Sequence, residues 1–251
     1  VRRESGRIAR YAHLSTGNYN AGTARIYSDI GLLTSDEDIC SDVGALFNML
    51  TGISEPVSWR ALTIAPTDLR RRMEELIERE RELSTEERPG LIMAKMNSLE
   101  DSGMIRALAR AAAAGVRVDL NVRGICCLRP SEGEGRLRVI SILDRFLEHA
   151  RVYYFGNAGS PELYIASADI MGRNLDRRVE LMIPVLQPNI RERIVEALRI
   201  YMADNVNAWE LCADGKWSTV EGSGSTVRAQ EELYRRAVDC NRTSEGRFRP
   251  R

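Results

Sequence analysis

A histidine and an arginine stand two residues apart at the start of a predicted strand. Because side chains alternate along a strand, His149 and Arg151 can point to the same side. A free imidazole titrates near neutral pH, so it can act as an acid or a base, and it can also form a covalent intermediate. The planar guanidinium of an arginine binds two oxygens of an anion at once. The pair therefore indicates anion chemistry, although a histidine hydrogen-bonded at a helix end beside Glu148 would show the same pattern.

Other polar residues follow predicted turns and strand ends. Asn18 comes after a glycine that lets the backbone approach an anion closely, and its amide can orient a neighbouring group. A plain strand-ending turn is the alternative. Arg123 ends a strand before a glycine, and open α/β sheets place ligands at the carboxyl ends of their strands. Lys95 and Asn97 stand at another strand end and are weaker candidates of the same kind.

Charged residues after the turn at 167–169 could line the same site. Arg173 and Arg177 would contribute a basic wall, and Asp176 and Glu180 would hold those arginines by ion pairs. A solvated charged face is equally compatible with this pattern.

Two further basic features are interpreted as structural. The arginines at 70–72 alternate with glutamates at helical spacing, which indicates an exposed helix with intrahelical ion pairs and no ligand. The second histidine of the chain, His13, lies in a predicted strand.

Composition excludes several classes of protein. Of 251 residues, 43% are hydrophobic, as in an ordinary globular protein, and the 36 basic residues balance 36 acidic ones. The chain thus has no global attraction for nucleic acid or acidic lipid. The five cysteines form no Cys-x-x-Cys pair, so neither a disulfide framework nor a zinc site is indicated. No apolar run approaches the roughly 20 residues that cross a bilayer, and the first residues lack a signal-peptide pattern, which together predict a cytoplasmic protein.

The periodicity of apolar residues predicts an α/β fold, because strands and helices alternate along most of the chain. Helices are predicted over 42–51, 70–83, 101–114, 141–147, 189–202 and 227–240, with Thr67 as an N-cap candidate for the second. Strands are predicted over 61–66, 91–96, 116–122, 151–155, 163–167 and 179–185, with hairpins over 2–14 and 207–224. A flexible link is expected at 222–225, and fraying from Arg242. The break at 52–56 predicts a domain boundary, with domains over 1–58 and 59–251.

Short segments spread over almost the whole chain resemble the long, histidine-phosphorylated bacterial type of polyphosphate kinase. They are HLSTGNYN (13–20), TARIYSD (23–29), KMNSLED (95–101), VRGICCLRP (122–130), EHAR (148–151), SAD (167–169) and RNLDRRVE (173–180). The resemblance implies a phospholipase D-like mixed sheet flanked by helices. Residues 1–58 would be the C-terminal remnant of a first phospholipase D-like catalytic domain, and 59–251 the second. The opening VRRE (1–4), without Met, resembles the end of a strand in that family, which implies a C-terminal portion.

The resemblance also assigns roles to residues. His149 corresponds to a non-phosphorylated histidine that touches nucleotide phosphates and acts as acid or base. Tyr27 corresponds to a tyrosine that hydrogen-bonds the phosphates, with a buried core tyrosine as the alternative, and Arg123 to an arginine that grips the phosphates of ATP. Supporting roles are expected for Asn18, Arg151, Arg173 and Asp169. The phosphate-accepting histidine of the family lies in a His-x-Lys segment, which these 251 residues lack, so the nucleophile is expected upstream.

The implied function is reversible transfer of the terminal phosphoryl group of ATP to inorganic polyphosphate through that upstream phosphohistidine. ATP or ADP and polyphosphate are the expected ligands, nucleic acid is not, and a homotetramer is the expected assembly. The family needs Mg²⁺, whose ligands are expected outside this chain. The chain alone is expected to be inactive, and to be cytoplasmic or peripheral to the membrane.

Two alternatives remain open. One is a phospholipase D-type phosphodiesterase or nuclease, against which stands the absence of any His-x-Lys followed by Asp. The other is a non-catalytic oligomerisation module.

Overall fold

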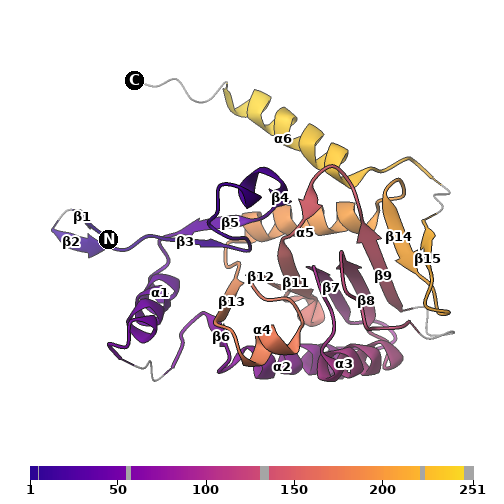
Figure 1. Cartoon of the computed structure of the whole chain (residues 1–251), viewed down its shortest axis with the longest axis horizontal. Helices are drawn as coiled ribbons and strands as arrows, with labels where there is room; N and C mark the ends of the chain where they lie inside the picture. The colour runs from indigo at the N-terminus through magenta and orange to yellow at the C-terminus, as the bar shows by residue number, and fades with distance from the viewer. Residues whose placement is uncertain (5, 55–57, 131–135, 221–223, 246–251) are drawn as a thin grey trace.

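A nine-stranded mixed sheet forms the centre of the computed structural model, which describes residues 1–4, 6–54, 58–130, 136–220 and 224–245 (Figure 1). The strands lie in the order β15-β14-β9-β8-β7-β11-β12-β13-β6. Their bounds are Thr63–Ala65 (β6), Leu91–Met96 (β7), Arg117–Val122 (β8), Leu137–Ile142 (β9), Arg151–Phe155 (β11), Glu162–Ala166 (β12), Glu180–Pro184 (β13), Ala208–Leu211 (β14) and Trp217–Thr219 (β15). Only the pairs β7-β8 and β8-β9 of this sheet are parallel. The predicted α/β class, a mixed sheet flanked by helices, is confirmed.

Helices cover both faces of the sheet. In Figure 1, α2 and α3 run below the strands and α5 runs above them, with α6 beyond α5. The helices are Glu37–Leu50 (α1), Leu69–Leu83 (α2), Ser102–Ala113 (α3), Gly172–Asp176 (α4), Pro188–Met202 (α5) and Ala229–Glu245 (α6), with short 3₁₀ turns at Thr23–Arg25 and Asn157–Gly159.

Strand β7 shows how the two layers of core are built. Ile92, Ala94 and Met96 belong to the apolar cluster that includes α2 and α3, while Met93 belongs to the cluster that includes Val195 of α5. This alternation follows from the period of two along a strand. It places Lys95 on the same side as Met93, toward α5.

The N-terminal segment carries small sheets of its own. Strands β1 (Arg2–Glu4) and β2 (Arg7–Ala9) form the predicted hairpin, and β3 (Ala12–Ser15) pairs with β5 (Gly31–Thr34). Strand β4 (Tyr27–Ser28) instead pairs in parallel with β10 (Leu147–Glu148), more than a hundred residues away. This short pairing brings the start of the chain to the residue that follows β10, His149.

The N-terminal segment also shares a core with the main sheet. Leu14, Leu32 and Ile39 belong to one apolar cluster with Ile64 and Val152. A buried carboxylate adds to this contact: Asp42 of α1 accepts hydrogen bonds from the backbone N–H groups of residues 60, 61 and 62, at 2.9, 2.8 and 2.9 Å. Segments on either side of residue 59 therefore pack together, and the division into domains at that point stays a prediction.

One predicted helix is wrong. Residues 141–147 do not form a helix: Ser141 and Ile142 end β9, and the segment ends in β10. The run Val139, Ile140 and Ile142 is almost wholly buried, and its β-branched side chains suit a central strand. Pairing with β8 and β14 satisfies its backbone, a contribution that local spacing does not show. His149 consequently lies between two strands rather than at a helix end.

Several boundaries also differ from those predicted. The first helix begins at Glu37 rather than 42, because the Asp36 side chain caps it by accepting a hydrogen bond from the Ile39 N–H at 3.0 Å. Thr67 is not the N-cap of α2; that position is Asp68, and the Thr67 hydroxyl donates to the Ile64 carbonyl. Helix α6 continues past residue 242 to 245, while 246–251 and residues 222 and 223 of the predicted link at 222–225 lie outside the described residues.

Candidate active site

His149 is held between strands by a carboxylate from the N-terminal segment. Its side chain is 11% exposed, and Nδ1 lies 3.0 Å from each carboxylate oxygen of Asp29. A proton on Nδ1 donated to Asp29 fixes the tautomer and leaves the Nε2 lone pair as the acceptor. The ring of Tyr27 lies 4.5 Å from the imidazole, centroid to centroid. The β4-β10 pairing thus brings two predicted nucleotide-contacting residues, Tyr27 and His149, into one site.

Asp29 is itself fixed by its neighbours. Its Oδ1 accepts a hydrogen bond from the Thr16 hydroxyl at 2.7 Å. Burial disfavours the charged carboxylate, but the hydrogen bonds from His149 and Thr16 outweigh it and hold the pKa of Asp29 below its ordinary value. Gly17 packs so closely that a Cβ at this position would lie 2.1 Å from Oδ2 of Asp29. Asp29 is therefore an ionised, preorganised partner of the imidazole.

Arg151 lies beside His149, as the alternation predicts, but its charge is already paired. Its Nε and Nη2 donate to the two carboxylate oxygens of Asp169 at 3.1 and 3.0 Å, and both side chains are about nine-tenths buried. Its Nη1 donates to the Thr16 carbonyl at 2.9 Å and lies 3.2 Å from Nε2 of His149. The geometry gives Arg151 a positioning role, because Nε, Nη1 and Nη2 of its guanidinium already donate to protein acceptors and few N–H groups remain for a ligand.

Asn97 joins the two halves of the cluster. Its backbone N–H donates to Asp169 at 2.7 Å, and its side-chain amide donates to the His149 carbonyl at 3.2 Å. Its Oδ1 accepts a hydrogen bond from Nε of Arg123 at 3.0 Å. Arg123 and His149 are thus linked through a single buried amide. The absence of a side chain at Gly124 permits this approach, since a Cβ there would lie 2.9 Å from the Asn97 carbonyl.

Arg123 differs from Arg151 in having a free fork. Its side chain is partly exposed, and within the described residues it makes no ion pair. Both terminal nitrogens therefore remain available to bind two oxygens of a phosphate. The site combines one unpaired cation, one carboxylate-oriented imidazole and one tyrosine, which suits a phosphorylated ligand.

The structure shows no bond from the side chain of Asn18 or Arg173 to the described residues of this cluster. Both residues are exposed, and among the described residues no hydrogen bond or ion pair joins either side chain to the cluster. The expected ion pairs of Arg173 and Arg177 with Asp176 and Glu180 are wrong. The reason is that other partners are closer.

Arg70 is the partner of Asp176. It donates to Asp176 at 2.7 and 2.6 Å and to Asp101 at 3.0 and 2.7 Å, so it bridges three helices rather than standing on a solvated face. Glu180 accepts hydrogen bonds from Ser167 and Asn174 and lies 3.7 Å from Arg178.

Sequence reasoning missed Asp29 and Thr16 as members of the site. Asp29 stands two residues after Tyr27, in a segment already singled out, so this proximity was the available signal. Its partner His149 is 120 residues away, and no local pattern predicts that contact. His13, by contrast, contacts Tyr19 with Nδ1 at 2.8 Å from the hydroxyl and makes no recorded contact with His149 in the described part of the chain.

The described residues contain no group of three or more His, Cys, Asp or Glu side chains that could hold a metal ion. No helix of this part of the chain is both long and apolar enough to cross a membrane.

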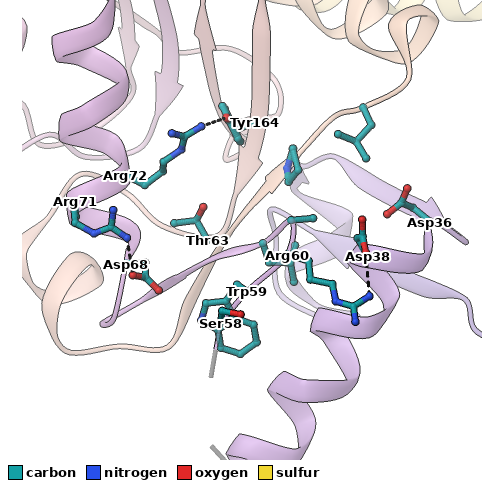
Figure 2. A pocket seen from close by; sticks show the side chains of 14 residues that line it. Asp36, Asp38, Ser58, Trp59, Arg60, Thr63, Asp68, Arg71, Arg72 and Tyr164 are labelled. Carbon is teal, nitrogen blue, oxygen red and sulfur yellow. Dashed lines mark hydrogen bonds and ion pairs between the residues drawn. The ribbon is translucent and has the colours of Figure 1, made fainter. Parts of the chain in front are cut away.

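A separate cavity of about 650 Å³ lies between α1, β6 and α2 (Figure 2). Three arginines face it, but each is already occupied: Arg60 by Asp38, Arg71 by Asp68, and Arg72 by the Tyr164 hydroxyl. None of the residues around His149 lines this cavity, and its three arginines already have partners, so it is not the candidate site.

Comparison with known proteins gives a consistent family. The family described as polyphosphate kinase C-terminal domain 1 matches residues 1–56, and polyphosphate kinase C-terminal domain 2 matches residues 62–230. Polyphosphate kinase 1 of Chlorobaculum tepidum is 46% identical over 97% of this chain, and the polyphosphate kinase of Thermosynechococcus vestitus is 50% identical over 86% of it. The chain spans only 35% and 30% of the lengths of these two relatives.

Solved structures agree with this assignment. The crystal structure of polyphosphate kinase from Porphyromonas gingivalis matches 93% of this chain and 36% of its own length, with a TM-score of 0.89 and 41% identity. A phospholipase D family member, Nuc from Salmonella typhimurium, matches 55% of this chain at 13% identity and a TM-score of 0.42, too low a likeness to bear on function. On the family matches and the extent of identity, the chain belongs to the polyphosphate kinase family.

Proposed function

We propose that this chain forms the C-terminal part of a catalytic site that reversibly transfers the terminal phosphoryl group of ATP to inorganic polyphosphate. The observation that carries the proposal is Arg123, which makes no ion pair with any described residue and is linked through Asn97 to a histidine that Asp29 orients. The names of the relatives support the substrate class. The phosphate-accepting histidine of the reaction lies upstream of Val1 in this proposal, so the chain alone turns over poorly.

Each residue has a role that its contacts suit. Arg123 binds non-bridging oxygens of the nucleotide or polyphosphate and offsets the charge that builds up during transfer. His149 moves a proton at Nε2, while Asp29 contacts Nδ1 and orients the ring. Tyr27 donates its phenol to a phosphate oxygen. Arg151 and Asp169 do not touch the ligand; their bidentate pair holds the loop and the imidazole in place.

Among the described residues, no group of three or more His, Cys, Asp or Glu side chains could hold Mg²⁺. The proposal therefore keeps its ligands outside the chain and derives no step through it. Self-association and a cytoplasmic location, with or without peripheral contact with a membrane, remain part of the proposal. Nothing in the site favours a phosphodiesterase over a kinase.

Calorimetric titration of ATP and of long-chain polyphosphate tests the site, with the ionic strength held constant. We expect Arg123→Ala to weaken the binding of both ATP and polyphosphate. A charge-assisted contact to phosphate contributes about 1.5 to 3 kcal/mol, which corresponds to about tenfold in affinity or more. The matched control is Arg106→Ala, which removes an exposed arginine from α3. Equal affinities for the wild type and Arg123→Ala would overturn the assignment.

A further inference from the structure

Lys95 is a buried lysine beneath the candidate site. It lies on β7 facing α5, its side chain is 2% exposed, and its Nζ lies 5.2 Å from the centre of the Tyr201 ring. Lysine is almost never fully buried unless its charge is paired. Burial lowers the pKa of Lys95, and the nearby carboxylate of Glu148 opposes that effect. The role proposed above for His149 makes no use of this buried cation.

The partners of Lys95 flank His149 in the chain. Its Nζ lies 3.1 Å from Oε2 of Glu148, the residue before His149, and donates to the carbonyl of Ala150, the residue after it, at 3.2 Å. The ammonium group of Lys95 therefore binds the residues on either side of His149 in the chain.

Glu148 connects the pair to two further elements. Its side chain is 1% exposed, and its Oε1 accepts a hydrogen bond from Gln230 of α6 at 2.6 Å. Its Oε2 accepts one from Ser28 of β4 at 3.4 Å, and Ser28 directly precedes Asp29. Gln230 also pairs with the backbone of Phe146, donating at 2.8 Å and accepting at 2.9 Å. The strand that leads to His149 is thus held from β7, β4 and α6.

We propose that Lys95 and Glu148 are positioning residues for His149: the buried ion pair fixes the backbone on both sides of the imidazole and keeps the ring against Asp29. The proposal depends on the proposed function only for what His149 then does with a nucleotide.

One general principle and one observation favour a role in positioning His149 over a role in stabilising the fold. A buried ion pair contributes little stability compared with apolar residues of similar size, because desolvation of both charges offsets their attraction. In addition, a cavity of about 130 Å³ lies beside the pair, lined by Lys95, Asp29 and Tyr201 among others. The neighbouring side chains therefore leave room for this region to shift once the pair is broken.

The test uses the whole chain and four single variants. Lys95→Met and Glu148→Gln each break the pair. Lys216→Met is the matched control for the first, because Lys216 is the other lysine of the chain and is 85% exposed. Glu210→Gln is the control for the second, since Glu210 pairs with Arg138 in a partly exposed position away from the site.

A double variant, Lys95→Met with Glu148→Met, removes both charges and replaces them with apolar side chains. We expect it to recover melting temperature relative to the single variants, because no unpaired buried charge remains. It restores none of the hydrogen bonds to Ala150, Ser28 or Gln230, so we expect His149 to stay displaced.

Three quantities are measured for every variant: the NMR signals of the two histidine rings, the melting temperature, and the affinity for ATP. His13 serves as an internal reference, because it is the other histidine of the chain. In Lys95→Met, in Glu148→Gln and in the double variant, we expect the His149 ring signals to shift or broaden while those of His13 do not. If only about a tenth of the molecules keep the ordered ring, the apparent Kd for ATP rises about tenfold. Both controls should match the wild type.

The outcomes distinguish the possibilities. Recovery of the His149 signals together with the melting temperature in the double variant would show that the pair only stabilises the fold, and would overturn the proposal. Unchanged His149 signals in the single variants would overturn it as well. If the wild type binds no ATP but the His149 signals respond as expected, the positioning role is supported and the proposed function of this chain is not.

Discussion

The contact between Asp29 and His149 gives the imidazole a defined proton and orientation. Both carboxylate oxygens lie 3.0 Å from Nδ1, and the Thr16 hydroxyl also donates a hydrogen bond to Oδ1 of the carboxylate. Because Nδ1 contacts Asp29, Nε2 is the ring nitrogen left for a ligand, and in this structure the Nη1 of Arg151 lies 3.2 Å from it. Arg123, which no acidic residue in the described part of the chain neutralises, supplies the charge that a phosphate requires. Chemistry at this site thus depends on which side chains remain unpaired.

Gly17→Ala tests the Asp29 contact without altering a polar group. The added Cβ would lie 2.1 Å from Oδ2 of Asp29, so the carboxylate must move away from His149. We expect a loss of about 1 to 3 kcal/mol in the free energy of unfolding, the usual cost of leaving a buried polar partner unsatisfied. Chemical denaturation measures this loss, and NMR of the His149 ring reports the displacement.

Gly44→Ala is the control for that substitution. Gly44 lies within α1, and a Cβ added there would meet no neighbouring atom within 4 Å, so alanine should stabilise the helix by about 0.5 to 1 kcal/mol. If Gly17→Ala behaved like Gly44→Ala, the close approach to Asp29 would not matter.

Short elements carry most of the positioning. Strands β4 and β10 have two residues each, yet their pairing brings Tyr27 and Asp29 to His149. The segment that leads into β10 is bonded to the start of α6. Arg228 donates to both carboxylate oxygens of Asp144 at 2.6 and 2.9 Å, and Gln230 accepts a hydrogen bond from the backbone N–H of Phe146. Helix α6 is therefore part of the structural support of the site although it contributes no ligand contact.

The ion pair between Asp144 and Arg228 should make the stability of the chain depend on pH. Hydrogen bonds from Arg228 outweigh burial and lower the pKa of Asp144 to about 2. A carboxyl group whose pKa is lower in the folded than in the unfolded state stabilises the fold above its unfolded pKa, near 3.9. That contribution is lost as the pH falls from about 4 toward 2.

Denaturant unfolding of the wild type and of Asp144→Asn across pH 2 to 6 measures this effect. We expect the wild type to be more stable above about pH 4 and the difference to shrink toward pH 2, since distant titrating groups cancel between the two proteins. A difference that stayed constant over this range would show that the ion pair between Asp144 and Arg228 does not stabilise the fold.

On the scale of the whole molecule, the N-terminal segment and the main sheet share one core. Ile39 of α1 lies in the same apolar cluster as Ile64 of β6 and Val195 of α5, and the Asp42 carboxylate binds the backbone that begins β6. The site spans the same junction, because Asp29 and Thr16 come from one side and His149 and Asp169 from the other. The predicted boundary at residue 59 therefore need not separate independently stable units.

Ile39→Ala tests this coupling. Ile39 is 2% exposed, so we expect a loss of about 2 to 5 kcal/mol, seen as one shifted transition of the whole chain. Far-UV circular dichroism follows all helices. Fluorescence is recorded with Trp59, which packs on the same apolar cluster as Ile39, replaced by Phe, so that it reports Trp209 and Trp217 in the distant β14-β15 hairpin. The two curves should coincide.

Leu33→Ala, at a side chain on β5 that is 77% exposed, should leave the transition where it is. A separate early transition in Ile39→Ala, without movement of the tryptophan signal, would indicate two independent domains.

Local patterns were sufficient for the elements whose stability is largely local. Helices α2, α3 and α5 begin and end within two residues of the predicted bounds, and Arg151, predicted to lie beside His149 by alternation alone, does so. The missed strand β9 shows the limit. Its backbone is satisfied by β8 and β14, and its residues would tolerate either structure in isolation.

The sequence by itself therefore determined the α/β class and the family resemblance, and it predicted Tyr27, Arg123 and His149 as residues of the site. Only the tertiary structure decided that Arg151 is neutralised by Asp169, that Arg123 makes no ion pair within the described residues, and that Lys95 lies buried under His149. The physical reason is that helix and strand periodicity arise between near neighbours in the chain, whereas the charge state and orientation of a side chain depend on partners that folding brings from far away. Asp29 and His149, 120 residues apart, meet only because a two-residue strand pairs with another across the molecule.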